Sequence, residues 1–392
     1  MAADSRLTGK PLFSAAEMRR RRAAFGAAMA RHGVPYALVY GANRAGSAVT
    51  WLTGWPVTRE ALLVAGPEPD ADVLLVSFYN HLPQARRLSC VRAEWAGERA
   101  TATALALLAA RGPLPERIGL AGPVPFGQYR MLAEQITDVA DLNRAYTALR
   151  LVKSAEEIAA LRRAAALTDD AVAALGRALR PGATEHEAIA QVEHAYVAQG
   201  GLHHIHYLTT TAMAEPDRSV PAQWPSARRI QPGDLAICEV SAAVAPDYAG
   251  QLLRTFTVQA EPIPLYAELH AAAAAAFDAI LRRLRPGATA ADLAAAGGRV
   301  IEDAGFAGID DLVHGFGGGY LPPVIPAPGR DAPVPDFALA AGMTVVVQPN
   351  VVTPDQRAGV QTGELLLVTE HGPERLHSFP PGLLRVGGAG AG

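Results

Sequence analysis

Three of the chain's histidines stand within four residues, in the segment His203-His204-Ile205-His206. A neutral imidazole exchanges protons near pH 7, so the cluster is a candidate for acid–base chemistry or for substrate binding. Side chains alternate between the two faces of an extended strand, which predicts that His204 and His206 share one face. The alternative interpretation is a solvated strand end without a chemical role.

Two other motifs argue against particular kinds of site. The segment Gly315-Phe-Gly-Gly-Gly319 resembles a phosphate-binding loop, but no strand, glycine-rich turn and helix with a lysine surround it, so a nucleotide site is not expected. Cys90 and Cys238 are the only cysteines, too few for a disulfide framework or a thiolate metal site.

Composition and charge exclude further classes of protein. The 35 Lys and Arg against 38 Asp and Glu give a net charge of −3 without a basic run, so a nucleic-acid partner is not expected. No apolar stretch approaches the roughly 18 residues of a membrane span, so no membrane partner is expected either. The segment Met1–Lys10 lacks the layout of a secretion signal, and we therefore expect a cytoplasmic protein.

The first 148 residues predict an α/β domain with a parallel or mixed sheet, because short β-rich runs alternate with amphipathic helices. Helices are expected at 14–32, 100–111 and 127–136, and strands at 36–40, 61–64, 72–76 and 118–121. The segment 146–153 marks the boundary, since Ser154 and Glu157 directly after it have the spacing of a capping box at the start of a long helix.

Residues 149–392 contain an internal duplication. Leu179-Arg-Pro-Gly-Ala-Thr184 recurs 105 residues later as Leu284-Arg-Pro-Gly-Ala-Thr289, and each copy offers a threonine to cap a second helix. Strand-rich sequence follows each helix pair, so we predict an α+β domain of two pseudo-symmetric halves with a site between them. The glycine-rich end, residues 386–392, is expected to be a flexible tail.

Landmarks of a known superfamily occur along this chain in the superfamily's order. They are Gly233-Asp234 before a strand, Arg254-Thr-Phe256, His314-Gly-Phe-Gly317 and Gly342-Met343. With them the chain resembles the pita-bread superfamily of methionine aminopeptidase, Xaa-Pro aminopeptidase, prolidase and creatinase. The resemblance covers nearly the whole chain and matches the creatinase and aminopeptidase P branch, with an α/β domain before a pseudo-two-fold pita-bread domain.

The resemblance implies a site for two divalent metals held by two Asp, one His and two Glu. In this chain the five positions carry Glu239, Gln251, His314, Gln348 and Gly363. Two bridging dications need several anionic oxygens, whereas a glutamine is neutral and a glycine supplies no ligand. Glu364 stands one residue beyond the last position, and a one-residue slip on a strand points its side chain to the other face. We therefore expect neither a metal nor another cofactor.

Without a metal, the same positions predict acid–base chemistry on a polar small-molecule substrate. His314 is expected to be the general acid or base, and Glu239 to orient it or to hold a substrate cation. Gln251 and Gln348 would bind the substrate by hydrogen bonds. Arg254 is expected to pair with a carboxylate behind the sheet, and Tyr320 to fill the core.

The creatinase branch adds candidates outside these positions. Its resemblance implies that Arg59 reaches from the N-terminal domain into a partner's active site, and hence that the protein is a homodimer. Creatinase carries a histidine where this chain has Ala222-Gln223-Trp224, so His204 and His206 are the substitute candidates for substrate binding, and Trp224 is a further one.

These observations favour a metal-independent, creatinase-like hydrolase or lyase acting on a C–N bond. Two alternatives stay open at this point. One is a metal-dependent Xaa-Pro aminopeptidase or prolidase, and the other is a binding protein of this fold that is non-catalytic or has diverged from hydrolysis.

Overall fold

The computed structural model describes residues 12–43, 45–330 and 332–387. The chain divides into two compact units, the first ending at Arg150 and the second beginning at Leu151, within the segment that the sequence marks as the boundary. The N-terminal Met1–Lys10 and the last five residues of the predicted tail lie outside the described residues. None of the described helices is both long and apolar enough to cross a lipid bilayer.

Unit 1 is built on a mixed six-stranded sheet with the strand order β4-β3-β2-β1-β5-β6. The strands are β1 (Ala37–Ala42), β2 (Glu60–Ala65), β3 (Val73–Val76), β4 (Arg92–Trp95), β5 (Arg117–Ala121) and β6 (Asp138–Asp141). β2 runs antiparallel to β1 and to β3, and the other neighbouring pairs are parallel. The predicted α/β domain with a mixed sheet is confirmed.

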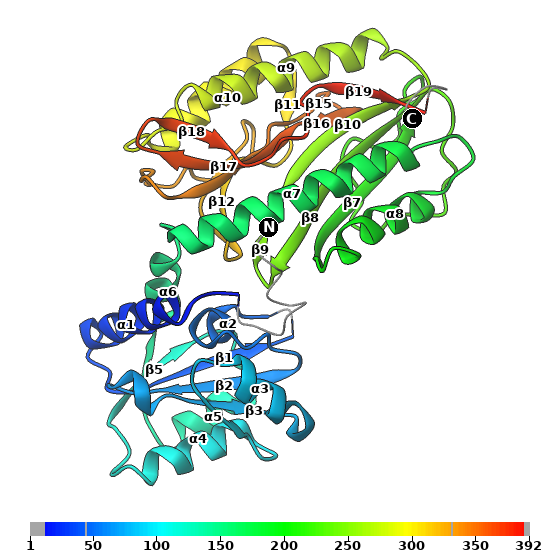
Figure 1. Ribbon diagram of the computed structural model, residues 1–392. Helices are drawn as coiled ribbons and strands as arrows, with labels where there is room; N and C mark the ends of the chain where they lie inside the picture. The colour runs from blue at the N-terminus through cyan, green and yellow to red at the C-terminus, as the bar shows by residue number, and fades with distance from the viewer. Residues whose placement is uncertain (1–11, 44, 331, 388–392) are drawn as a thin grey trace. The chain divides into compact units, whose positions relative to one another are not determined.

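Helices cover both faces of this sheet. They are α1 (Ala15–Arg31), α2 (Ala48–Thr53), α3 (Leu82–Leu88), α4 (Ala100–Ala109), α5 (Phe126–Ala133) and α6 (Asn143–Leu149), with 3-10 turns at Pro69–Ala71 and Tyr79–His81. Figure 1 shows α4 and α5 on one side of the strands and α1, α2 and α6 on the other. The sequence did not indicate α2, α3 or α6, which are each seven residues or shorter.

The duplicated motif of unit 2 forms equivalent helix starts. The helices are α7 (Ala155–Ala178), α8 (Glu185–Val197), α9 (Pro264–Leu281) and α10 (Ala290–Asp303). Thr184 caps α8 and Thr289 caps α10, each in a capping box with the residue three positions later. Both threonines also make an isolated β-bridge, to Arg229 and to Ala338. The predicted pseudo-symmetry is therefore present in the local structure.

The strands of unit 2 form a ten-stranded sheet with the central order β13-β12-β14-β17-β10-β8-β7, and a small sheet ordered β11-β15-β16. Their bounds are β7 (Leu202–Ala212), β8 (Asp234–Ala245), β9 (Tyr248–Ala249), β10 (Leu252–Val258), β11 (Ala307–Gly308), β12 (Asp311–Phe316), β13 (Tyr320–Pro326), β14 (Thr344–Val347), β15 (Asn350–Val352), β16 (Gly359–Gln361), β17 (Gly363–Thr369), β18 (Gly372–Arg375) and β19 (Leu383–Val386). The predicted start of the tail, residue 386, is too early, because Val386 is the last residue of β19 and pairs with Val258.

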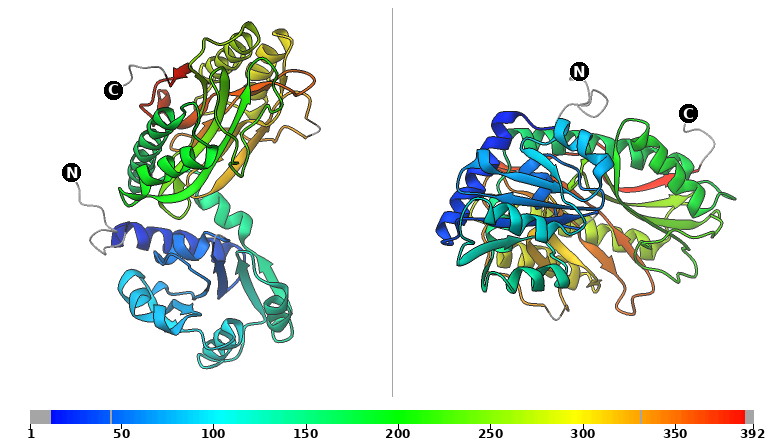
Figure 2. Two further views of the ribbon diagram at one scale, coloured as in Figure 1. Left: turned by 90° about the vertical axis from the view of Figure 1, so that its right-hand side faces the viewer. Right: turned by 90° about the horizontal axis from the view of Figure 1, so that it is seen from below.

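Two helices of the first half determine which face of β8 is apolar. Cys238 and Val240 belong to a fully buried cluster with residues of α7 and α8. The same helices lie against β7 and β8 in both views of Figure 2, where all four are green. Since strand side chains alternate, Glu239 points to the opposite face of β8.

Candidate functional site

Four polar side chains converge on the face of the large sheet that carries Glu239. We call Glu239, Gln251, His314 and Gln348 the polar cluster. Nε2 of Gln251 donates a hydrogen bond to Oε1 of Glu239 at 2.7 Å and lies 3.4 Å from Oε1 of Gln348. The Gln348 side chain also interacts with the His314 ring. Each of the four is buried, with at most 9% of its surface exposed.

Strand order explains why residues so distant in sequence meet. Glu239 lies on β8 and His314 on β12, while Gln251 directly precedes β10 and Gln348 directly follows β14. β12, β14, β17, β10 and β8 are successive neighbours in the sheet, so the cluster spans both halves of the duplication. A site between the halves was expected from the repeat, and the four side chains lie between the halves.

Burial dominates the electrostatics of Glu239. It raises the pKa of this carboxyl to about 7, and the charge of Asp310 adds to the effect while the Gln251 hydrogen bond opposes it. The ionised form is therefore poorly compensated by its surroundings. Asp310 was not predicted as part of the site, because it lies outside the five aligned positions.

His314 is in an environment that keeps its ring neutral. Burial lowers its pKa to about 4, against smaller opposing contributions that begin with a Gly315 backbone hydrogen bond. Nδ1 lies 3.2 Å from that carbonyl oxygen, and assigning the ring proton to Nδ1 on this basis leaves the lone pair on Nε2. His314 is thus a weaker base at neutral pH than an ordinary histidine. Of the two groups, Glu239 has the pKa closer to 7.

Tyr320 covers His314 instead of filling the core. Its ring stacks on the imidazole with centroids 4.1 Å apart, and its hydroxyl donates to Asp311. With 55% of its surface exposed, Tyr320 connects the buried cluster to solvent. The prediction of a core residue is therefore wrong; the β12–β13 pairing places Tyr320 opposite Phe316 at the end of the hairpin.

Glu364 forms a buried ion pair with Arg254. Its carboxylate accepts a hydrogen bond from Nη2 of Arg254 at 2.9 Å and another from Nη2 of Arg375 at 2.7 Å. Glu364 and Arg254 each expose only 1% of the side chain. This confirms that Arg254 pairs with a carboxylate. It also explains why Glu364 is buried, so Glu364 need not replace the ligand missing at Gly363.

The prediction that His204 and His206 share one face of the strand is wrong. A β-bulge interrupts the β7–β8 pairing, because His203 faces Ala242 while Ile205 already faces Ser241. His206 faces Val240 and so lies on the helix-covered side, opposite to Glu239. His204 lies on the other side, with its ring 5.7 Å from that of Phe316. Of the two, only His204 is near the cluster.

Trp224 and Arg59 are the two remaining candidates. Trp224 is 86% exposed in the segment between β7 and β8. Arg59 belongs to unit 1, where its guanidinium lies 4.9 Å from the centre of the Phe78 ring. Among the seven predicted site residues of unit 2, the structure thus brings four together, with His204 close by.

The residue types of the polar cluster could supply ligands to one divalent cation but not to two. A second dication would require carboxylates that Gln251, Gln348 and Gly363 cannot supply. Three groups could still act as ligands to a cation: the Glu239 carboxylate, Nε2 of His314 and Oε1 of Gln251. Oε1 of Gln251 is buried and accepts no hydrogen bond from the described residues. An oxygen–nitrogen–oxygen set of this kind suits Mn²⁺, Co²⁺ or Zn²⁺.

An α/β unit followed by a duplicated α+β unit, with a polar cluster between the halves of the duplication, is the two-domain pita-bread architecture of the peptidase–creatinase superfamily. The chain belongs to metallopeptidase family M24, whose model matches residues 159–370. Residues 21–152 match the creatinase/prolidase N-terminal domain.

Individual relatives agree with this membership. The chain is 30% identical over 246 residues to the probable dipeptidase PepE of Mycobacterium tuberculosis, a match that spans 61% of each protein. It is 25% identical over 264 residues to the Xaa-Pro dipeptidase of Pyrococcus furiosus, covering 67% of this chain and 73% of that protein. The crystal structure of dipeptidase PepE from Mycobacterium ulcerans matches with a TM-score of 0.78 at 25% identity, over 96% of this chain and 100% of that one.

The prediction of a metal-independent, creatinase-like hydrolase or lyase is wrong. The relatives are named dipeptidase and Xaa-Pro dipeptidase, and the family is one of metallopeptidases. A hydrolase was expected, and the family agrees with that part. The prediction rested on the anionic ligands lost at positions 251, 348 and 363, and that loss does not exclude a single cation held by the remaining carboxylate, imidazole and amide groups.

Proposed function

We propose that this chain is a metal-dependent dipeptidase that hydrolyses short peptides, Xaa-Pro dipeptides among them, at the polar cluster. The observation that carries the proposal is the convergence of Glu239, Gln251, His314 and Gln348 at the family's functional positions, from strands of both halves. The names of the relatives support the substrate class.

One divalent cation would be held by the Glu239 carboxylate, Nε2 of His314 and Oε1 of Gln251. Bound there, it would polarise the scissile carbonyl and lower the pKa of an attacking water. The raised pKa of Glu239 means that protons compete with the cation below about pH 7, so we expect activity to rise with pH through this range.

The chain's own groups orient the reactants. Nε2 of Gln251 donates to Oε1 of Glu239 and so fixes the carboxylate in one orientation. The Gln348 amide can donate to the oxygen of the substrate carbonyl without adding charge. The Tyr320 ring packs on His314 and excludes water from one face of the imidazole.

The test is a panel of Xaa-Pro and other dipeptides, assayed with EDTA or with added Mn²⁺, Co²⁺ or Zn²⁺. We expect metal-stimulated cleavage, about one ion per chain in the cluster, and at least a ~100-fold loss of kcat/KM in His314→Ala. His371→Ala, which changes an exposed turn histidine, is the control. Dipeptides that stabilise the fold without being cleaved under any condition would replace the peptidase proposal with a binding function.

We also propose a homodimer in which Arg59 contacts substrate bound by the partner subunit, as the resemblance to creatinase implies. Light scattering should then give twice the mass of the chain at micromolar concentration. Arg59→Ala should raise KM about 10-fold with little change in melting temperature, because Arg59 makes one ring contact within its unit. Arg87→Ala is the matched control, an exposed arginine of the same unit. A monomer would remove the role of Arg59.

A cytoplasmic location is part of the proposal. Cys90 and Cys238 are both free thiols, and burial raises the pKa of Cys238 to about 12, so this thiol is unreactive. Recovery of the protein from the medium instead of the cytoplasmic fraction would contradict it.

A further inference from the structure

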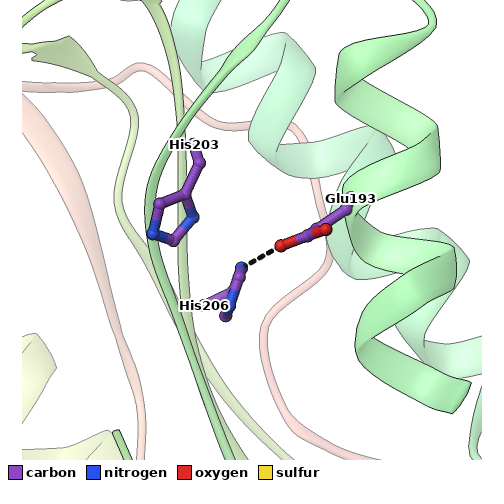
Figure 3. Close-up of side chains that lie close together, drawn as sticks. All are labelled: Glu193, His203 and His206. Carbon is purple, nitrogen blue, oxygen red and sulfur yellow. Dashed lines mark ion pairs between the residues drawn. The ribbon is translucent and has the colours of Figure 1, made fainter. Parts of the chain in front are cut away.

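A second group of ligand-type side chains lies on the other face of the sheet. Glu193 of α8 faces His203 and His206 of β7, and the three point toward one another (Figure 3). Their ligand atoms all lie within 4.8 Å of one another, and Nδ1 of His206 is 3.2 Å from Oε1 of Glu193. The dipeptidase proposal uses none of these three residues.

The bulge in β7 is what makes this arrangement possible. Residues three apart in a regular strand point to opposite faces. With His204 as the extra residue, the alternation is reset, so His203 and His206 share the helix-covered side with their ring centroids 4.3 Å apart. Bulges of this kind re-aim side chains, and here the result is two imidazoles facing one carboxylate.

One ring nitrogen of His206 is buried without a hydrogen bond from the described residues. Its Nδ1 is buried, and the Glu193 contact lacks the geometry of a hydrogen bond, so among the described residues this nitrogen has no hydrogen-bond partner. A buried polar atom without a partner is costly unless a ligand satisfies it.

We infer that Glu193, His203 and His206 form a binding site for a divalent transition metal, Zn²⁺ in the first place. Ligands of a tetrahedral zinc ion, each about 2.1 Å from the metal, lie about 3.4 Å apart. The Glu193–His206 spacing of 3.2 Å is already close to this value, and the outer limit of 4.8 Å requires only small side-chain rotations.

The ligand types select the ion. Two imidazoles and one carboxylate suit zinc, cobalt or nickel and do not suit calcium or magnesium, which prefer oxygen alone. Glu193 keeps 48% of its side chain exposed and His203 is also exposed, so an ion can enter from solvent. Three protein ligands leave a fourth position for water or another donor. Such an ion would link α8 to β7 and stabilise the first half of unit 2.

The experiment is a titration of the full-length, EDTA-treated and desalted chain with ZnCl₂ and, separately, with CoCl₂. It is run in the Glu239→Gln background, so that an ion in the polar cluster does not contribute. We expect one zinc per chain, the visible spectrum of four-coordinate cobalt, and a higher melting temperature with zinc. His203→Ala and His206→Ala should each weaken zinc binding at least ~10-fold and abolish the thermal shift.

Matched variants keep the test decisive. His194→Ala is the control, since His194 follows Glu193 on α8 but lines a separate hollow with α7 residues such as Arg177. His203 is exposed, so His203→Ala should fold normally even if the more buried His206→Ala does not. Zinc binding that is absent in the Glu239→Gln background, or unchanged in His203→Ala, would overturn the inference. Dipeptide hydrolysis by the otherwise wild-type chain decides the dipeptidase proposal separately.

Discussion

Replacing Glu239 by glutamine is expected to make the metal-free protein more stable at about pH 8 while lowering kcat/KM for dipeptides by at least ~100-fold. The carboxylate is buried, receives one hydrogen bond from Gln251, and lies in the field of Asp310. A glutamine of the same shape removes the uncompensated charge, and we expect a gain on the order of 2 kcal/mol in the free energy of unfolding. The same substitution removes the only carboxylate proposed to hold the cation.

The stability gained by Glu239→Gln should depend on pH, because the pKa of Glu239 is higher in the native state than in the unfolded state. The native state binds the Glu239 proton up to about pH 7, and the unfolded state only up to its ordinary value of 4.5. Between these values the native state binds more protons, so the free energy of unfolding falls as pH rises. The gain from Glu239→Gln should therefore be absent at about pH 4, grow across this window, and level off above it.

Denaturant unfolding in EDTA at several pH values measures this gain. The lowered pKa of His314 acts in the opposite direction, with stability lost as pH falls from 6.5 toward about 4. Because His314 is present in both proteins, most of its effect cancels in the difference. Glu215→Gln, at an exposed glutamate, is the charge-matched control and should show no gain. An equal loss of stability at every pH would mean that Glu239 is a structural residue.

Much of the fold followed from local patterns. The capping boxes of Ser154, Thr184 and Thr289 are present, and each satisfies backbone N–H groups at the start of a helix. The repeated Arg-Pro-Gly-Ala-Thr turn therefore predicted the duplication. Short elements such as α2 and β4 carry too few residues for a periodic pattern, and the sequence did not reveal them.

The site was only partly predictable. Aligned landmarks placed Glu239, Gln251, His314 and Gln348, which do meet in space. Alternation failed for the histidines of β7, because a bulge inserts one residue and no local signal in the sequence marked it. The environment of His314 was also hidden, since burial depends on strands that are far apart in the chain.

Glu364 is expected to be the most important charged residue for stability among those beside the cluster. Replacing it with glutamine keeps the shape but leaves the Arg254 guanidinium, 1% exposed, without its counter-charge. Removing one partner of a buried pair typically costs about 3–5 kcal/mol, because the remaining charge stays desolvated. Backbone carbonyls of Leu253, Gly363 and Pro380 still accept hydrogen bonds from Arg254, so we expect about 3 kcal/mol, measured by denaturant unfolding.

A surface pair close to Glu364 provides the control. Glu374 of β18 pairs with Arg162 of α7, and both side chains are more than a third exposed, so Glu374→Gln should change stability by at most about 1 kcal/mol. In a double-mutant cycle, Arg254→Met combined with Glu364→Gln should cost less than the sum of the two single changes, because neither charge is then left alone. The opposite result has a definite meaning. If Glu364→Gln leaves stability unchanged but abolishes metal binding, Glu364 is a ligand after all, and the single-cation assignment to Glu239, His314 and Gln251 is wrong.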